Sequence, residues 1–249
     1  MNLFDQYGIK EVADVTIYKI ADDGTETPFL FLDSLKVSTL EQTAEQAEAR
    51  GGKGNSPLII WDYGKEITVT LEDALYSPAS MALMFGGKDA VWASVTAMTK
   101  TLRYVATGST APTKLDDGGL ASDAGKWAVE KLTDATGKTV TTVTKGETYI
   151  ATVSATIVGN KLTIDADDFP GTYKLVGDTY ARNRDSGKDE YFQFVIPRAK
   201  MNAEETLTLE AEGDPTTFNL TMRVLRPKTG HMIELIQYNL GEAAQTTGK

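Results

Sequence analysis

The chain has 249 residues, with 25 Lys and Arg against 35 Asp and Glu, one His, no Cys and a formal net charge of -10. A chain of this length buries roughly 70% of its extended surface on folding, so it needs no disulfides to form a core. The lack of Cys excludes thiolate metal sites and Cys nucleophiles, and a single His excludes a multi-His metal centre. The acidic excess argues against binding to nucleic-acid phosphates.

The N-terminal residues lack the basic start and apolar stretch of a signal peptide. No apolar run approaches the ~18 residues that a membrane helix needs. We therefore expect synthesis in a cytoplasm and no association with a membrane.

Most of the sequence alternates between apolar and polar residues. Ile67, Val69 and Leu71 alternate with polar residues from Glu66 to Glu72, a pattern typical of a half-buried antiparallel strand. The same pattern recurs at 206–212 and 217–224. Further strands are predicted at 12–20, 29–39, 58–63, 91–106, 127–132, 149–158, 162–164, 172–176, 191–196 and 232–238. The sequence predicts a mainly β fold, an antiparallel β-sandwich or barrel.

One short flanking helix is predicted at 77–85. Ser77 can cap it, Pro78 suits the first helical position, and two glycines follow its end. Met81, Met84 and Phe85 form a stripe that we interpret as core packing on a sheet.

The segment 40–50 is ambiguous, because its residues favour a helix but present no apolar stripe. As a helix it would bury nothing, so the alternative is a long polar hairpin arm that is exposed to solvent. The Gly-rich residues 51–57 are predicted to form a flexible loop.

A second loop, 108–125, offers little for a core and is the best domain boundary. We predict an N-terminal part of a β domain at 1–107, with a long loop at 40–56 and the helix at 77–85. A linker and Thr-rich β segment follows at 108–168, as an insertion or as more strands of the same domain. The β domain then continues at 169–241, and 242–249 form a mobile tail.

No catalytic motif is present, because phosphate loops and nucleophile elbows both fail on inspection. His231 is interpreted as a surface residue in a turn. Asn183, Asp185, Gly187 and Asp189 alternate as calcium ligands do, but interleaved basic residues favour a charged hairpin turn. We predict no enzyme activity, no metal and no cofactor.

A competing hypothesis is a β-sandwich carbohydrate-binding module, or a virion-associated glycan-active protein. Trp61, Trp92 and Trp127 could form a sugar platform, although Trp61 lies within an apolar run and is interpreted as core. Carboxylate pairs for glycoside hydrolysis stay open, because sequence spacing does not report their separation.

Several stretches resemble the major tail tube proteins of long-tailed, non-contractile bacteriophages, the siphophages. The longest is Glu45 to Ser77, which includes Gly-Gly-Lys-Gly-Asn-Ser-Pro-Leu-Ile-Ile-Trp-Asp-Tyr-Gly-Lys-Glu. The others are Gly-Thr-Tyr-Lys-Leu-Val-Gly-Asp-Thr-Tyr-Ala-Arg-Asn from Gly171, Asp-Glu-Tyr-Phe-Gln-Phe-Val-Ile-Pro-Arg-Ala-Lys from Asp189, Glu-Ala-Glu-Gly-Asp-Pro from Glu210 and Met-Arg-Val-Leu-Arg-Pro from Met222. The middle of the chain carries no such motif.

The resemblance implies a β-sandwich subunit that joins five others, so that the inner sheets close into a ring-spanning β-barrel. The hexameric rings would stack into a virion tail tube for genome ejection, and tape measure, terminator and distal tail proteins would bind at its ends. The long loop would make the inter-ring contact. Its expected residues are Glu41, Glu45, Glu48, Arg50, Gly51, Gly52, Lys53, Gly54 and Asn55.

In such a tube the negative net charge of the chain would act on the DNA that passes through it. Six chains of -10 give roughly -60 per ring, and an acidic lumen would repel DNA, which passes without specific binding. Glu66, Glu72, Glu210 and Glu212 lie on polar strand faces and are the candidates for lining it. The alternative places them on the outer surface or in ion pairs between subunits.

Overall fold

The computed structural model describes residues 6–85, 92–117, 127–167, 169–202, 206–208, 216–228 and 230–239. The chain forms two compact units. Unit 1 comprises Met1–Val91 and Thr163–Lys249, and unit 2 comprises Trp92–Leu162. Both are built from antiparallel strands, so the mainly β fold with one short helix that the sequence predicted is confirmed.

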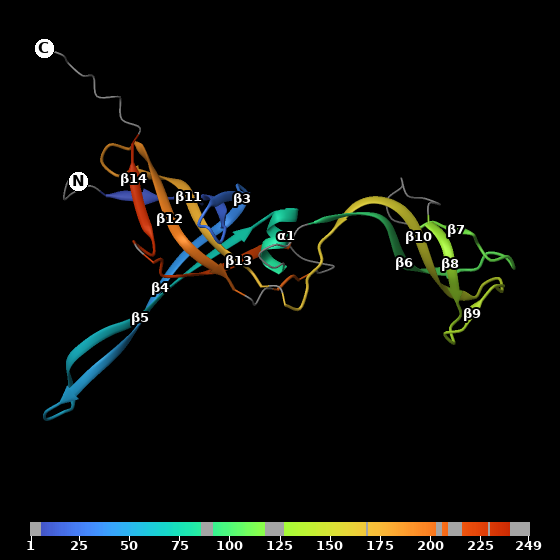
Figure 1. The fold of residues 1–249 in the computed structure, drawn as a ribbon, viewed down its shortest axis with the longest axis horizontal. Helices are drawn as coiled ribbons and strands as arrows, with labels where there is room; N and C mark the ends of the chain where they lie inside the picture. The colour runs from blue at the N-terminus through green and yellow to red at the C-terminus, as the bar shows by residue number, and fades with distance from the viewer. Residues whose placement is uncertain are drawn as a thin grey trace, which may run out of the picture. The chain divides into compact units, whose positions relative to one another are not determined.

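Unit 1 is a nine-stranded antiparallel sheet (Figure 1). Its central path runs in the order β3-β2-β11-β12-β13-β5-β4, with β1 added on β11 and β14 on β12. The described strands do not close into a barrel, which leaves β3 and β4 as the two edges of the path. The strands are β1 (Tyr7–Ile9), β2 (Asp14–Ile20), β3 (Glu26–Leu32), β4 (Leu35–Gly51), β5 (Ser56–Asp73), β11 (Thr172–Asn183), β12 (Asp189–Met201), β13 (Phe218–Val224) and β14 (Glu234–Tyr238).

The core of unit 1 lies on one face of this sheet. Val69 and Leu71 of β5 are fully buried, as their alternation predicted, and so are Ile17 and Leu175 on neighbouring strands. Gly177 lies directly beneath Phe194, because a Cβ at this glycine would come within 2.2 Å of the ring. The alternation therefore sets which face of each strand is buried.

The helix α1 (Pro78–Phe85) is confirmed where the sequence placed it. The hydroxyl of Ser77 accepts the backbone N–H of Ser80 at 3.1 Å, and the Ser80 hydroxyl accepts the N–H of Ser77 at 2.8 Å. This reciprocal cap satisfies two free amides. Of the predicted stripe, Met84 is buried in the core, and Met81 and Phe85 are partly buried against it. The other buried residues of the helix are Ser80, Ala82 and Leu83. No helix in the described residues is long and apolar enough to cross a membrane.

Three strand predictions were wrong in whole or in part. Residues 162–164, predicted as a short strand, are not one. The predicted strand 29–39 is interrupted by a turn, where Ser34 donates a hydrogen bond to the carboxylate of Asp73 at 2.6 Å and accepts one from the N–H of Ala74 at 3.2 Å. The first described residues of the strand predicted at 206–212, 206–208, are not a strand. The strand that pairs with the C-terminal end of β12 is β13, through Met201 and Met222.

Unit 2 is a five-stranded antiparallel sheet with its own core. Its strands are β6 (Ala93–Val105), β7 (Lys114–Leu115), β8 (Trp127–Thr133), β9 (Thr139–Val140) and β10 (Thr148–Lys161). They are ordered β6-β10-β8-β7, and β9 pairs with β8. Trp127 is buried, and the ammonium of Lys100 lies 3.9 Å from the centre of its ring. Because β6 and β10 pair along most of their length, this unit includes residues that precede the 108–125 loop.

Candidate functional site

The described residues contain no group of three His, Asp or Glu side chains that could hold a metal ion. His231 is exposed in the segment that leads into β14, as predicted. Trp127 is buried in the core of unit 2. It is therefore not available for a sugar platform with Trp61 and Trp92.

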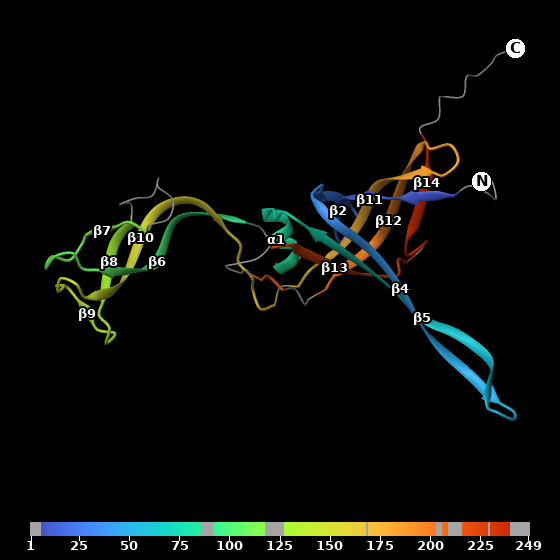
Figure 2. The same ribbon diagram turned by 180° about the vertical axis from the view of Figure 1, so that it is seen from behind.

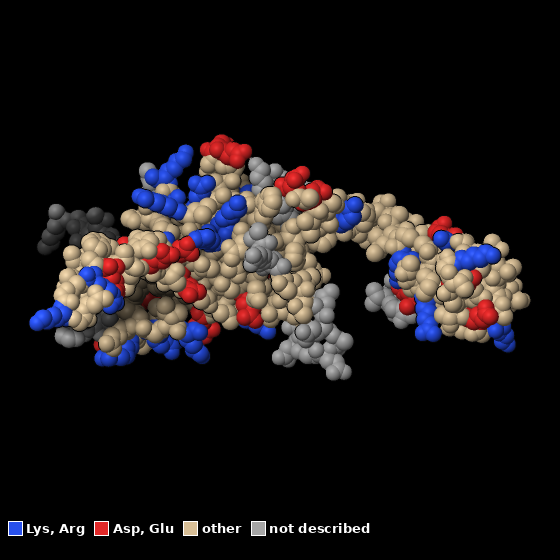
Figure 3. Space-filling model, turned by 90° about the horizontal axis from the view of Figure 1, so that it is seen from below, with Lys and Arg blue, Asp and Glu red and all other residues tan. Residues whose placement is uncertain are grey.

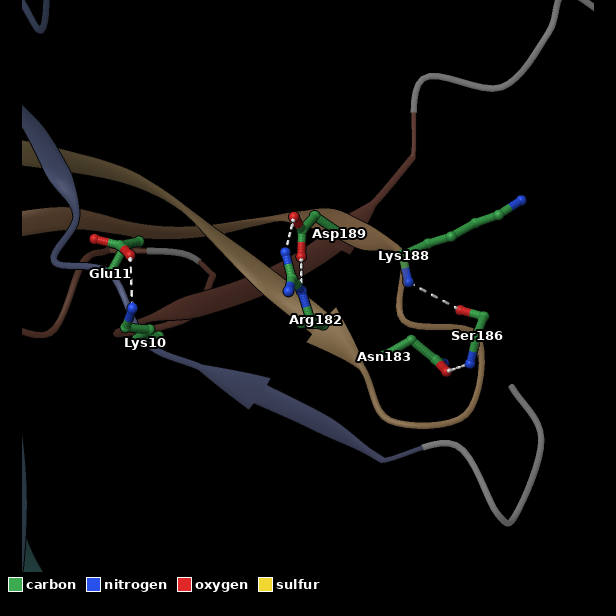
Figure 4. A network of polar contacts seen from close by, with 7 residues as sticks. All are labelled: Lys10, Glu11, Arg182, Asn183, Ser186, Lys188 and Asp189. Carbon is green, nitrogen blue, oxygen red and sulfur yellow. Dashed lines mark hydrogen bonds and ion pairs between the residues drawn. The ribbon is translucent and has the colours of Figure 1, made fainter.

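The predicted charged turn joins β11 to β12 (Figure 4). Arg182 makes two parallel hydrogen bonds to the carboxylate of Asp189, at 2.6 and 2.7 Å. The side-chain oxygen of Asn183 accepts the N–H groups of Asp185 and Ser186, both at 2.9 Å. These contacts confirm the hairpin turn in place of a calcium loop. The bonds from Arg182 also hold the pKa of the Asp189 carboxyl below its ordinary value of 3.8.

The strands β4 and β5 form the longest hairpin of unit 1, paired from Leu35 and Asp73 to Gly51 and Ser56. The next strand, β13, pairs with β5 only over residues 68–73. Residues 44–65, which we call the arm, therefore project beyond the sheet as a two-stranded ribbon (Figure 2). At its tip Gly52, Gly54 and Asn55 all have positive φ, which suits glycine and asparagine.

The nine residues predicted for inter-ring contact lie on this hairpin. Glu41 is in the half that pairs beside the sheet, and Glu45, Glu48, Arg50 and Gly51 follow on the arm part of β4. The other four, Gly52, Lys53, Gly54 and Asn55, form the tip. The sequence left two alternatives for this segment, a helix and a hairpin arm, and the structure shows the hairpin arm. The nine residues form a strand and a turn rather than a long loop. Their role in contact between rings stays a prediction.

The second strand of the arm is apolar and exposed, which the sequence interpretation missed. Trp61, expected in the core, is 53% exposed, because its strand has no sheet behind it. Leu58, Ile59, Ile60 and Tyr63 are exposed as well. The signal was the unbroken apolar run opposite a strand made of polar residues and alanines, since such runs are normally buried on both faces.

Two of the four acidic residues predicted to line the lumen lie within the described residues. Glu66 is exposed on β5 and forms an ion pair with Arg223 of β13. Glu72 is half-buried and lies opposite Asn219 and Val37 on the neighbouring strands. Glu210 and Glu212 lie outside the described residues. Acidic and basic side chains are mixed on the face that Figure 3 shows, so the acidic excess is not concentrated in one continuous patch there.

An aromatic cluster that the sequence did not single out spans three strands. The rings of Tyr191 and Tyr238 stack with centres 5.1 Å apart, and Tyr180 lies 5.4 Å from Tyr191. Tyr191 and Tyr238 fall in predicted strands, whereas Tyr180 lies beyond the strand predicted at 172–176, which extends to Asn183 in the structure. Their clustering depends on the pairing of β12 with both β11 and β14, which no local pattern reveals.

The family comparison covers nearly all of this architecture. The sequence model of the YomU/Tube protein family matches residues 7–237, which span both units. A comparison with individual curated proteins gives no significant match. The chain belongs to the YomU/Tube protein family, a family of phage tail tube proteins, and is a structural protein of the tail tube.

Proposed function

We propose that the chain polymerises as stacked hexameric rings that form the tube of a virion tail, a conduit through which the genome leaves. Family membership supports a structural protein of such a tube. The observation that carries the finer proposal is that unit 1 combines an open sheet with an arm that none of the other described strands covers.

The open edges of the sheet suit ring formation. β3 pairs only with β2, and β4 only with β5, among the described strands. Unpaired strand edges lead to association unless another chain or a neighbouring element covers them. In a ring each subunit would cover its neighbours' edges, and the inner sheets would together form a ring-spanning β-barrel. A head-to-tail contact of this kind closes by rotation.

The arm suits contact along the tube axis. Its tip carries Lys53, and Arg50 pairs with Glu48 just below the tip. An axial contact that repeats without closing builds a filament. Other tail proteins would take the place of a ring at the two ends of the tube.

The lumen is proposed to be acidic. Glu72 faces uncharged neighbours, so its charge is available to repel phosphate, whereas the charge of Glu66 is balanced by Arg223. Repulsion would keep passing DNA from adhering. In this proposal the lumen depends on Glu72 more than on Glu66.

Negative-stain electron microscopy of the purified chain, at rising concentration, tests the proposal. We expect six-fold rings or hollow tubes. Analytical ultracentrifugation of the same samples should show correspondingly large species. A chain that stays monomeric under all these conditions would overturn the proposed assembly.

A further inference from the structure

The arm has two unlike faces. In the register of the ribbon, Ala49 lies opposite Ile59, Ala47 opposite Trp61, and Glu45 opposite Tyr63. Directly opposed residues of an antiparallel pair project to the same side. The residues that share this face are therefore Glu45, Ala47, Ala49, Ile59, Trp61 and Tyr63. The face is apolar apart from Glu45 at its inner end, and we call it the apolar face of the arm.

The opposite face mixes charged and polar residues with two exposed apolar side chains, Leu58 and Ile60. Gln46 lies opposite Asp62, and its amide donates a hydrogen bond to the Asp62 carboxylate at 2.8 Å. Glu48 lies opposite Ile60 and pairs with Arg50. The polar side chains of this side therefore pair with one another within the ribbon.

The described residues of unit 1 leave the apolar face uncovered. Ile59 is 52% exposed and Tyr63 53% exposed. A two-stranded hairpin is marginally stable in water without a sheet or helix to pack on. The small Ala side chains make this face flat, which allows close approach of another surface. The arm is thus built to be completed by a partner.

An apolar groove lies at the root of the same arm. It has a volume of about 210 Å³, and seven of its eleven lining residues are apolar. Its floor is formed by Val69, Phe192 and Phe194, and its rim by Ile9 and Leu40, which are 54% and 39% exposed. The groove is smaller than the about 300–1,000 Å³ of typical small-molecule sites. It matches the size of a large side chain.

The wall of the groove is the open edge of the sheet. Ser38, Thr39 and Leu40 belong to β4, the last strand of the sheet order. The hydroxyl of Ser38 is shielded from solvent and has no hydrogen-bond partner among the described residues. Such a buried polar group is costly unless a partner reaches it. The groove is thus incomplete in the isolated chain, as the arm is.

We propose that the apolar face of the arm of one copy packs into the groove of a second copy, with Trp61 as the main anchor. This inference rests on the proposed function, which supplies further copies of the chain. Each copy carries one arm and one groove, so the two surfaces occur in equal number. The same copy does not satisfy both, because its arm leads away from the sheet (Figures 1 and 2).

The position of the groove then determines how successive copies are linked. The arm begins just after Leu40, which lies on the rim of the groove. An arm seated in a groove therefore lies at the root of the next arm, and each copy donates one arm and accepts another. Such a contact is heterologous, so it propagates from copy to copy.

Disulfide trapping tests the contact, because the natural chain has no Cys. Leu40→Cys in the groove is combined in turn with Ile59→Cys, Trp61→Cys or Tyr63→Cys on the apolar face. After assembly and mild oxidation we expect at least one pair to give a ladder of covalently linked chains that collapses on reduction. Matched controls combine Leu40→Cys with Ile60→Cys or Asp62→Cys, which lie on the opposite face, and should give no ladder.

A second measurement does not depend on disulfide geometry. Trp61→Ala is expected to raise the protein concentration needed for assembly by about 30-fold, the effect of losing a buried aromatic anchor. Ile60→Ala, on the opposite face, should change it little. Thermal unfolding of both variants checks that unit 1 is intact.

The outcomes separate this inference from the proposed function. Tubes that form without any apolar-face ladder, or that tolerate Trp61→Ala unchanged, overturn the contact and leave the tube intact. A parent chain that never assembles overturns both. A ladder from the apolar face alone, together with the loss caused by Trp61→Ala, supports the contact.

Discussion

Two long hairpins of unit 1 follow the same rules of pairing and differ in what flanks them. The β11–β12 hairpin has β2 and β1 along one side and β13 and β14 along the other, so it stays within the sheet up to its turn. The β4–β5 hairpin has β13 beside only its inner half. Residues of the first are buried on alternate positions throughout β11, whereas the outer half of the second has no buried residue.

The difference teaches that strand pairing and burial are separate requirements. Backbone hydrogen bonds hold β4 and β5 together to the tip, yet only a third element behind the strands removes apolar side chains from water. The inner half of this hairpin stabilises the subunit. We infer that the outer half stabilises the assembly.

Removing the arm is expected to have the largest effect and tests whether the outer half of the hairpin serves the assembly. Thr43 pairs with Glu66, so residues 44–65 can be replaced by an Asn-Gly turn that closes the remaining hairpin. We expect complete loss of tubes and rings in electron microscopy, with the cooperative thermal unfolding of the subunit retained. Lys53→Ala keeps the arm and removes only the charge of a proposed contact residue at its tip, so a smaller loss of assembly is expected. Loss of cooperative unfolding in the arm deletion would show that the arm belongs to the subunit core.

A pair of truncations compares the two halves of the hairpin directly. Leu71→Ala removes a fully buried side chain and is expected to lower the free energy of unfolding by about 2–5 kcal/mol. Ile59→Ala lies on the arm and should change it by no more than about 0.5 kcal/mol. Chemical denaturation of the unassembled chain measures both. Equal losses at the two positions would contradict the division between the halves.

The sequence was sufficient where local pattern decides the structure. Alternation at Val69 and Leu71 predicted their burial, and Ser77-Pro78 predicted the start of α1. It was insufficient for Trp61, because an apolar run does not reveal whether another strand lies beside it. The groove beside Leu40 was also beyond prediction, since it depends on residues of β1, β4 and β12 that are far apart in the chain.

The smallest expected effect concerns the turn of the flanked hairpin. The pKa of Asp189 is lowered by its hydrogen bonds from Arg182, so the pair stabilises the fold above the ordinary pKa of 3.8. This contribution is lost as the pH falls through the lowered pKa of the folded state. Because both side chains are exposed, Asp189→Asn should reduce the melting temperature only slightly at neutral pH.

The pH dependence decides whether that small effect comes from the ion pair. The difference between Asp189→Asn and the parent should shrink as the pH falls through the lowered pKa of the folded state. It should vanish once the Asp189 carboxyl is protonated, because both proteins then carry an uncharged side chain at this position. Asp33→Asn, at another exposed carboxylate of unit 1, is the matched control for removing an exposed carboxylate. A difference that grew towards acid pH would contradict the assignment. The flanking strands, rather than the turn, would in either case supply most of the stability of this hairpin, because they cover both of its edges.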